Sequence, residues 1–318
     1  MPAPRLLSVV VPVFNEERSL SELADALEKV LPALAGAYEI LFVDDGSGDG
    51  SLQVLRRLSA SNERIRSFEL RKNFGKSTAL DVGFRMARGD VIVTMDADLQ
   101  DDPQEIPQLL AKLDEGYDLV VGWKMRREDP WSKRMASRIF NAVTALVSRV
   151  RIHDFNCGLK AFRAEVVQNV SMYGELHRYI PALAHWKGFK VCEIPVKHHV
   201  RKYGRSKYGP ERYLRGFFDL LTVAFITKFT GRPLHFFGVI GLMLIVPGSL
   251  ICAYLLAVKI TGGFIALRPL LTLGVLMLIL GMVFLSTGLL GEMIVYLFRS
   301  RDARLPGHVV RNTYGREQ

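Results

Sequence analysis

The order of apolar and polar residues divides the chain into an N-terminal part that mixes both kinds and a C-terminal part with long uncharged runs. Up to about residue 232, short apolar runs alternate with segments whose apolar residues recur at helical spacing. The predicted strands are Leu7–Val13, Glu39–Val43, Ile65–Leu70, Val91–Met95 and Leu119–Val121. The predicted helices lie around Leu20–Leu31, Leu52–Leu58, Ser77–Met86 and Ile106–Leu113. This alternation predicts an α/β fold with a mostly parallel sheet covered on both faces.

Two later segments, Phe236–Val258 and Pro269–Gly291, contain no charged residue. Each would span roughly 34 Å as a helix, enough to cross a hydrocarbon core of about 30 Å. A buried core helix is the alternative, but core helices are rarely uncharged over such a length, so we predict two membrane spans. The apolar stretch Leu6–Val13 is too short for a signal peptide and leads directly into polar residues.

The segment between these two parts, Glu211–Phe229, carries an aromatic and apolar face. Its members are Tyr213, Leu214, Phe217, Phe218, Leu221 and Phe225. The pattern indicates a helix lying in the membrane interface, and a core helix of the soluble domain is the alternative. The expected organisation is therefore a soluble domain over 1–208, an interfacial helix over 209–232, a two-helix hairpin over 233–298 and a basic tail over 299–318.

The formal net charge is +10, which would suit either nucleic acid or anionic lipid. Two membrane spans make the lipid bilayer, rather than nucleic acid, the expected partner. Only Lys259 and Arg268 carry charge between the spans, whereas basic residues are dense before the first span and after the second. The positive-inside rule thus predicts that the soluble domain and the C-terminal tail are cytosolic. Cys157, Cys192 and Cys252 are scattered and have no metal-ligand spacing.

A pair of carboxylates, Asp96 and Asp98, follows the predicted strand Val91–Met95. Residues two apart in an extended segment project to the same side, so both side chains can reach one cation. A Mg²⁺ or Mn²⁺ bound there would neutralise charge on a leaving diphosphate, and Gln100 offers a further oxygen ligand. The alternative is a capping turn before the next helix, where Asp is common.

Polar residues also follow the first two predicted strands. Asn15 and Glu16 follow the first, and Asp44, Asp45 and Gly46 follow the second. The ends of parallel strands meet at one edge of a sheet, so these side chains should lie near the Asp96 pair, where they suit base and ribose recognition. Capping of the following helices is the alternative for each cluster taken alone.

Together these segments resemble family 2 glycosyltransferases of the GT-A fold. The motifs are Val-Pro-Val-Phe-Asn-Glu-Glu at 11–17, Val-Asp-Asp-Gly-Ser at 43–47, Asn-Phe-Gly-Lys at 73–76 and Asp-Ala-Asp-Leu-Gln-Asp-Asp-Pro at 96–103. Within the family, the chain is similar to polyprenyl- or dolichyl-phosphate sugar transferases over about residues 5–300. The resemblance implies a nucleotide site made of Pro12, Val13, Asn15, Glu16, Asp44, Asp45, Lys76, Asp96 and Ala97. It also implies that Asp96, Asp98 and Gln100 hold the metal and diphosphate.

The resemblance extends to residues 150–160, where the family carries an Asp close to the donor sugar. Asp154 is the candidate general base. A phosphate acceptor is already anionic at neutral pH and needs little proton removal, so Asp154 has orientation of the sugar or acceptor as its other candidate role. Together with Asp98 it forms the predicted catalytic pair.

Cations suited to an acceptor phosphate occur in two regions. Lys124 and Arg126 follow a strand, and Arg134 and Arg138 share one face of a predicted helix over 131–147. A basic segment, 201–208, precedes the predicted interfacial helix, and the family closes an Arg-x-x-Gly-x-Ser-Lys element on the acceptor at this place. Arg201, Ser206 and Lys207 match that element, and unspecific attraction to anionic lipid is the alternative.

The expected reaction is a metal-dependent, inverting transfer from a nucleotide-sugar, of the UDP-glucose or GDP-mannose type, to polyprenyl phosphate at a bacterial inner membrane. The product would serve cell-envelope glycans or protein glycosylation. A processive polysaccharide synthase would need a Gln-x-x-Arg-Trp element, which is missing around Trp186, and a non-catalytic scaffold would not need every acidic and basic position. Gly274, Gly281 and Gly288 recur every seven residues and predict close packing, either with the first span or with another subunit of an oligomer.

Overall fold

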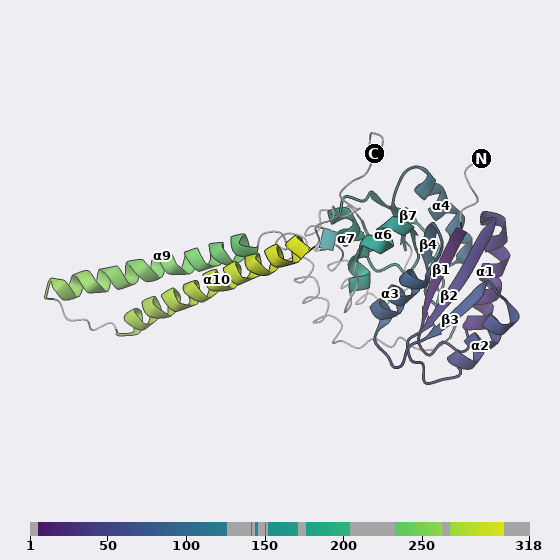
Figure 1. Ribbon diagram of the computed structural model, residues 1–318, viewed down its shortest axis with the longest axis horizontal. Coiled ribbons are helices and arrows are strands. Elements are labelled where there is room, and N and C mark those ends of the chain that lie inside the picture. Colours follow the sequence, from purple (N-terminus) through teal and green to yellow (C-terminus); the bar gives the residue numbers. More distant parts are fainter. Residues whose placement is uncertain are drawn as a thin grey trace. The chain divides into compact units, whose positions relative to one another are not determined.

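The computed structural model describes residues 6–125, 141, 144–145, 150, 152–170, 176–203, 233–262 and 268–301 (Figure 1). The chain divides into two compact units, Met1–Val223 and Ala224–Gln318. The boundary predicted at 208, the interfacial helix predicted over 209–232 and all but the first three residues of the tail predicted over 299–318 lie outside the described residues. They stay predictions.

The first unit is built on a sheet that has seven strands within the described residues. In spatial order these are β3 (Ile65–Glu69), β2 (Ala37–Asp44), β1 (Leu6–Val13), β4 (Val91–Thr94), β6 (Lys160–Arg163), β5 (Leu119–Trp123) and β7 (Val191–Pro195). The pairs among β3, β2, β1 and β4 are parallel, as is β5 with β7, and β6 runs antiparallel to both neighbours. The mostly parallel sheet expected from the sequence is confirmed.

Helices cover both faces of the sheet (Figure 1). They are α1 (Leu20–Leu34), α2 (Ser51–Ser61), α3 (Lys76–Met86), α4 (Ile106–Asp114), α6 (Ala164–Asn169) and α7 (Ile180–Trp186), with 3₁₀ turns η1 (Pro103–Glu105) and η2 (Leu176–Tyr179). Connections between parallel strands are right-handed, and the strand order reverses its direction after β3, so α1 and α2 lie on one face and α3 on the other. A Cβ on Gly83 of α3 would clash with the Val10 side chain, so α3 packs closely on β1.

The register of the central strands gathers the predicted site residues at one edge. β1 and β2 pair from Leu6–Ala37 to Val13–Asp44, and β4 runs parallel to β1 on its other side. The carboxyl ends of β1, β2 and β4 therefore meet at one edge, where the strand order reverses on either side of β1. This is the position at which open α/β sheets bind ligands.

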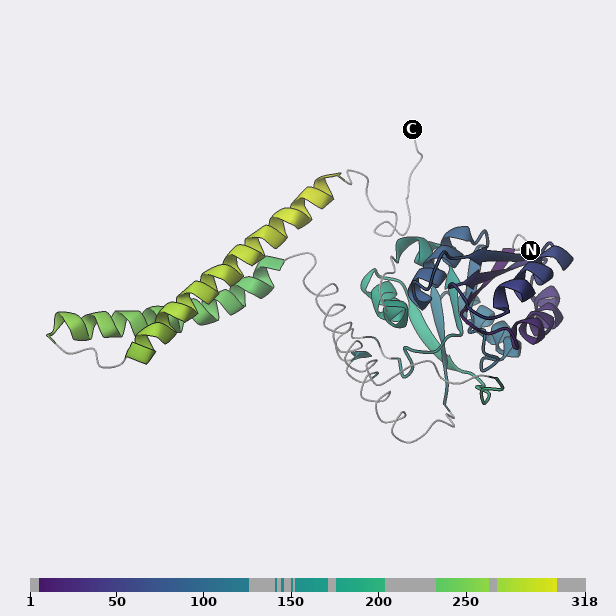
Figure 2. The same cartoon turned by 90° about the horizontal axis from the view of Figure 1, so that it is seen from below.

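The second unit contains two long apolar helices, α9 (Pro233–Ile260) and α10 (Arg268–Arg301), which pack against each other (Figure 2). Both are long and apolar enough to cross a membrane, and only 17% of the most apolar window of each is buried. Such exposure does not fit the core helix of a soluble protein, which would be mostly buried. The helices match the two predicted spans.

Glycines allow the two helices of this hairpin to approach closely. A Cβ on Gly281 of α10 would lie 2.8 Å from the carbonyl of Gly241 and 2.5 Å from Ile245. The same construction places Gly274 against Ile251 and Gly288 against Leu234 and Phe237 of α9. The sequence left open whether this glycine face packs on the first span or on another subunit, and within the chain it packs on the first span.

Candidate active site

The two carboxylates that follow β4 each hold a cation from a distant part of the chain. The Asp96 Oδ1 lies 2.5 Å from Lys76 Nζ at the start of α3, and the Asp98 Oδ2 lies 2.5 Å from a guanidinium nitrogen of Arg201. The second terminal nitrogen of Arg201 lies 3.7 Å from a Glu16 carboxylate oxygen, at the end of β1. Five residues predicted for nucleotide, metal or acceptor binding thus meet in one place.

The turn that carries both carboxylates, residues 96–99, has a constrained backbone and close neighbours. Leu99 has a φ of +60°, a left-handed conformation that costs a non-glycine residue energy and is maintained by its surroundings. A Cβ on Gly158 would lie 2.6 Å from the Asp96 carboxylate carbon, so only glycine fits against that carboxylate. The turn after β4 is therefore pressed against the loop before β6.

These residues fit a divalent cation whose remaining ligands come from the substrate. Within the described residues, no group of three or more His, Cys, Asp or Glu is placed to hold a metal. Mg²⁺ commonly binds through one or two carboxylates together with substrate phosphates and water, and Asp96 and Asp98 supply that minimum. The Gln100 amide contacts the His198 ring, at 3.3 Å, and the His199 carbonyl, at 3.2 Å. Its role as a metal ligand stays a prediction.

The acidic residues at the end of β2 organise the surrounding loops. Asp44 accepts hydrogen bonds from the backbone amide and hydroxyl of Ser47, and that hydroxyl in turn accepts from the Asn15 amide. Asp45 accepts from the amides of Phe74 and Gly75 at 2.7 and 2.9 Å. Burial raises the pKa of Asp45, the two amides oppose that rise, and the charge of Asp44 adds to it.

The nucleotide-binding role of Asp44 and Asp45 stays a prediction. In the structure their hydrogen bonds hold the loops at the carboxyl edge of the sheet. Of the other residues predicted there, Val13 and Ala97 are buried, and Pro12 lines a pocket beside Asp96.

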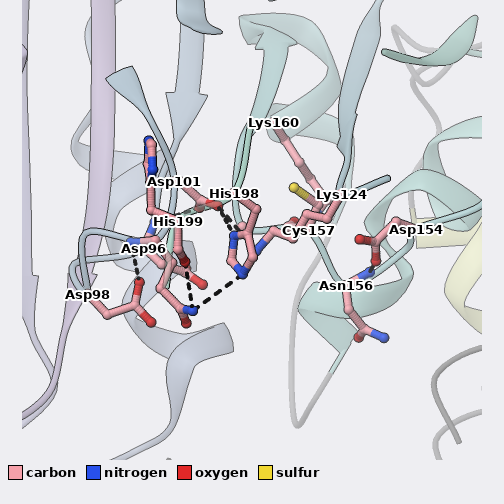
Figure 3. Close-up of polar contacts among 12 residues, drawn as sticks. Asp96, Asp98, Asp101, Lys124, Asp154, Asn156, Cys157, Lys160, His198 and His199 are labelled. Atoms are coloured by element: carbon pink, nitrogen blue, oxygen red, sulfur yellow. Dashed lines mark hydrogen bonds and ion pairs between the residues drawn. The ribbon is translucent and has the colours of Figure 1, made fainter. Parts of the chain in front are cut away.

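A buried charged cluster, which the sequence did not indicate, lies beside the Asp96–Asp98 turn. Lys124 Nζ lies 3.2 Å from Asp101 Oδ1, and His198 Nδ1 lies 3.7 Å from the same oxygen. Burial alone would raise the pKa of Asp101, but the Lys124 ammonium and His198 hold it well below its usual range. Figure 3 shows this cluster between the Asp96–Asp98 turn and the Asp154 loop. Lys124 was predicted for the acceptor phosphate, and here its charge is matched inside the protein.

Asp154 lies on the loop that leads to β6. It is 1% exposed, and its Oδ1 accepts a hydrogen bond from the Asn156 amide at 3.1 Å. The preceding His153 stacks on Trp123 with ring centroids 4.4 Å apart, and its amide donates to Glu193 of β7. These contacts fix the loop from both sides, and the catalytic role of Asp154 stays a prediction.

A second feature that the sequence did not reveal is a pocket beside Asp96. Its lining includes Lys76, Asn156, Lys160 and Arg178, together with the ring of His177. Lys160 is 5% exposed and donates to the Cys157 carbonyl. Burial lowers its pKa to about 8. Lys160 is the last residue of the segment 150–160 that contains Asp154, and the sequence pattern did not predict that its side chain is buried.

Five of the residues predicted for the acceptor phosphate fall outside the described part of the chain. They are Arg126, Arg134, Arg138, Ser206 and Lys207. Arg201 was also predicted for the acceptor phosphate, and in the structure it pairs with the Asp98 carboxylate.

The comparison with known proteins identifies the family of this chain. Residues 8–171 match the family model described as glycosyl transferase family 2. The chain belongs to glycosyl transferase family 2. The dodecaprenyl-phosphate galacturonate synthase of Rhizobium johnstonii is 38% identical over 317 residues, which cover 97% of this chain and 93% of that protein.

Solved structures of other glycosyltransferases show the same fold. Glucosyl-3-phosphoglycerate synthase from Mycobacterium tuberculosis, bound to phosphoglyceric acid, matches with a TM-score of 0.55 and 18% identity over 70% of this chain and 80% of that one. Its complex with Mn²⁺, uridine-diphosphate-glucose and phosphoglyceric acid matches with a TM-score of 0.54 and 18% identity, over 70% of this chain and 79% of that one. The GT-A fold expected for this family 2 enzyme is confirmed.

Proposed function

We propose that this glycosyltransferase moves a sugar from a nucleoside-diphosphate sugar to polyprenyl phosphate, with inversion at the anomeric carbon. The observation that carries the proposal is the meeting of Asp96 and Asp98 with Lys76 and Arg201 at the carboxyl edge of the sheet. The Rhizobium relative supports the acceptor class, because its name gives a dodecaprenyl-phosphate product and its similarity runs through both units of this chain.

Donor binding would exchange ion pairs at the turn after β4. A Mg²⁺ or Mn²⁺ between Asp96 and Asp98 would neutralise charge on the leaving diphosphate, and the crystallisation of the mycobacterial neighbour with Mn²⁺ supports a divalent metal. Lys76, released from Asp96, would then face the phosphates, for which an ammonium is a good partner. The loops shaped by Asp44 and Asp45 would surround the base and ribose.

Acceptor binding would use Arg201 and, from the segments outside the described residues, Ser206 and Lys207. The phosphate oxygen of the lipid attacks the anomeric carbon and forms the new C–O bond. The bond from that carbon to the nucleotide oxygen breaks, and its electron pair leaves with the nucleoside diphosphate. Because the acceptor oxygen is already anionic, no proton has to be removed, and Asp154 would orient the reacting groups. With an α-linked donor the product is β-linked.

The membrane arrangement follows from charge. We infer that α9 and α10 span the bacterial inner membrane with the catalytic unit and the tail in the cytosol, since the basic residues flank the hairpin on that side. The product would feed cell-envelope glycans or protein glycosylation. A homo-oligomer is compatible with this arrangement.

The test uses the full-length protein in detergent with labelled nucleotide-sugars, polyprenyl phosphate and Mg²⁺ or Mn²⁺. We expect labelled lipid only with metal present, and a loss of ~10³-fold in kcat/KM for Asp98→Ala, as is typical when charge stabilisation at the transition state is removed. Asp25→Ala, which removes an exposed carboxylate of α1, is the matched control. Undiminished transfer by Asp98→Ala would contradict the role of the turn, and labelled product only from a water-soluble acceptor would contradict the lipid.

A further inference from the structure

The pocket beside Asp96 carries more positive than negative charge. It is formed by residues of β1, α3, β4, the loop before β6, β6 itself and η2. Lys76, Lys160 and Arg178 contribute cations to its lining, and Asp96 is the one carboxylate that the described residues contribute. Lys76 already lies 2.5 Å from Asp96. The pocket adjoins the place where the donor diphosphate would bind. Its free volume is only about 10 Å³, room for one small group, so a substituent of the sugar rather than the whole ring would enter it.

Lys160 is the cation at the centre of this imbalance. It is 5% exposed, and within the described residues its hydrogen bond goes to the neutral carbonyl of Cys157, without an ion pair to any carboxylate. A buried ammonium that has no ion pair is costly. Burial lowers the pKa of Lys160 to about 8, although the charges of Asp96 and Asp154 oppose that fall. An anionic group in the pocket would remove that cost.

The same pocket has a buried acceptor without a donor. Asn156 Oδ1 is buried and has no hydrogen-bond partner among the described residues. His177, which lines the same pocket, is held in place by Ser77, whose hydroxyl lies 2.8 Å from His177 Nδ1 and accepts from the His177 amide at 3.1 Å. This fixes η2, which also carries the buried Arg178. The pocket therefore offers fixed cations and one unused oxygen.

We propose that this pocket selects a uronic acid donor, with Lys160 and Arg178 binding the 6-carboxylate of the sugar and Asn156 accepting a hydrogen bond from one of its hydroxyls. A neutral hexose would place a hydroxymethyl group beside Lys160 and leave the ammonium without a counter-charge. A carboxylate at the same carbon would form a buried, charge-assisted pair. The inference rests on the proposed transfer reaction, and the galacturonate in the name of the Rhizobium relative agrees with it.

The experiment compares two donors that differ only at carbon 6, UDP-galacturonic acid and UDP-galactose, with UDP-glucuronic acid and UDP-glucose as a second pair. Transfer to polyprenyl phosphate by the full-length protein gives kcat/KM for each, and calorimetry gives the affinity of each donor relative to UDP alone. The variants are Lys160→Met, which keeps the length of the side chain without its charge, and Lys29→Met, which removes an exposed lysine of α1 as the control.

We expect the wild type and Lys29→Met to prefer the acidic sugar of at least one pair by ~100-fold, as for loss of one partner of a buried charged pair. In Lys160→Met, the kcat/KM values for the acidic and the neutral donor of a pair should differ by less than about tenfold. Equal or better use of neutral donors by the wild type would overturn the inference and leave the proposed function standing. A preference that survives Lys160→Met would overturn the assignment to Lys160.

The binding data separate failure of the inference from failure of the proposed function. Tighter binding of the uronate than of its neutral partner, without transfer to the lipid, would support the pocket and contradict the acceptor. If Lys160→Met does not fold, the preference of the wild type for the acidic donor and its loss in Arg178→Gln test the same proposal, since Arg178 lines the same pocket from η2.

Discussion

At the scale of single residues, the site is held together by two cations that pair with the carboxylates proposed to bind a metal. Arg201 binds Asp98, and Lys76 binds Asp96. A divalent cation bound there would have to displace both, so each pair would oppose metal binding while it lowers the repulsion between the carboxylates. After displacement the same side chains are free to meet phosphate, so one set of charges would serve two stages of the reaction.

The first residue-scale prediction follows from this competition. Arg201→Gln should tighten Mn²⁺ binding to the substrate-free protein by ~5–10-fold, because the metal no longer displaces a guanidinium, a difference of about 1 kcal/mol. The same variant should lose transfer activity, because the acceptor phosphate loses a partner. Titration of Mn²⁺ followed by electron paramagnetic resonance measures the first effect. Arg85→Gln, at an exposed pair on α3, is the control, and an unchanged Mn²⁺ affinity in Arg201→Gln would refute the competition.

The second residue-scale prediction concerns pH. The pKa of Lys160 falls from 10.5 to about 8 on folding because the side chain is buried. Between these values the unfolded chain holds a proton that the folded chain lacks, so this lysine's contribution to stability rises with pH across that window. Below about pH 8 the cost is fully present, at about 3 kcal/mol.

Lys160→Met should therefore be more stable than the wild type at pH 7, and the difference should shrink towards pH 10. Urea unfolding of the two full-length proteins at both pH values measures it, in the absence of donor. A difference that does not change with pH would mean that Lys160 is not the titrating group.

Sequence patterns located the carboxylates but not their partners. Asp96, Asp98 and Glu16 follow apolar strands, and their position at the end of a strand is what makes them recognisable. Arg201 lies about 100 positions after Asp98, and Lys160 lies 64 positions after Asp96. Hydrophobic periodicity reports only local structure, so it does not predict contacts between residues so far apart in the sequence. The buried cluster of Asp101, Lys124 and His198 was missed for the same reason.

At the scale of elements, the first five strands were predictable and the last two were not. β1, β2 and β4 are apolar runs between amphipathic helices, which is the pattern of a buried parallel strand. β6 is Lys-Ala-Phe-Arg and β7 is Val-Cys-Glu-Ile-Pro, both short and interrupted by charged residues. β6 runs against its neighbours and carries Lys160 into the interior, so its interpretation requires knowledge of what packs on it.

One element-scale prediction concerns the loop before α3. Asp45 holds the amides of Phe74 and Gly75 and so fixes the start of the helix that carries Lys76. Asp45→Ala should destabilise the protein by about 2 kcal/mol, since two partly buried amides lose their acceptor. It should also raise the KM for the nucleotide-sugar. Urea unfolding and steady-state kinetics measure the two effects, with Asp81→Ala on the outer face of α3 as the control. Unaltered stability and KM would show that Asp45 does not maintain the loop.

A second element-scale prediction concerns the hairpin. Gly281→Leu would place side-chain atoms within 2.8 Å of the Gly241 carbonyl and against Ile245, so α9 and α10 would have to separate. We expect a clear loss of thermal stability in detergent. Met282→Leu, at the adjacent and 66% exposed position, changes volume little and should behave as the wild type. Equal melting temperatures for both variants would show that the glycine contact is not needed.

At the scale of the whole molecule, the two units divide the work that a lipid acceptor requires. The sheet edge collects the groups suited to a soluble, highly charged nucleotide, whereas the hairpin presents apolar side chains along its length, such as Met243, Leu250 and Met293. The charge distribution along the sequence links the two, because only Lys259 and Arg268 flank the connection between the helices. An acceptor that joins an anionic head to a long apolar chain fits both kinds of surface.

The whole-molecule prediction is the orientation of the hairpin. Alkaline phosphatase becomes active only where its disulfides can form, outside the cytosol, and a fluorescent protein reports the opposite side. Alkaline phosphatase fused after Gly262 should be active in a bacterial host, and the same fusion after Arg301 should be inactive, with the fluorescent reporter giving the reverse pattern. The reason is the excess of Lys and Arg before the first helix and after the second, which predicts that these flanks are cytosolic. Immunoblots of both fusions control for expression. Phosphatase activity after Arg301 would place the tail outside the cytosol, away from cytosolic nucleotide-sugars, and would contradict the proposed site of the reaction.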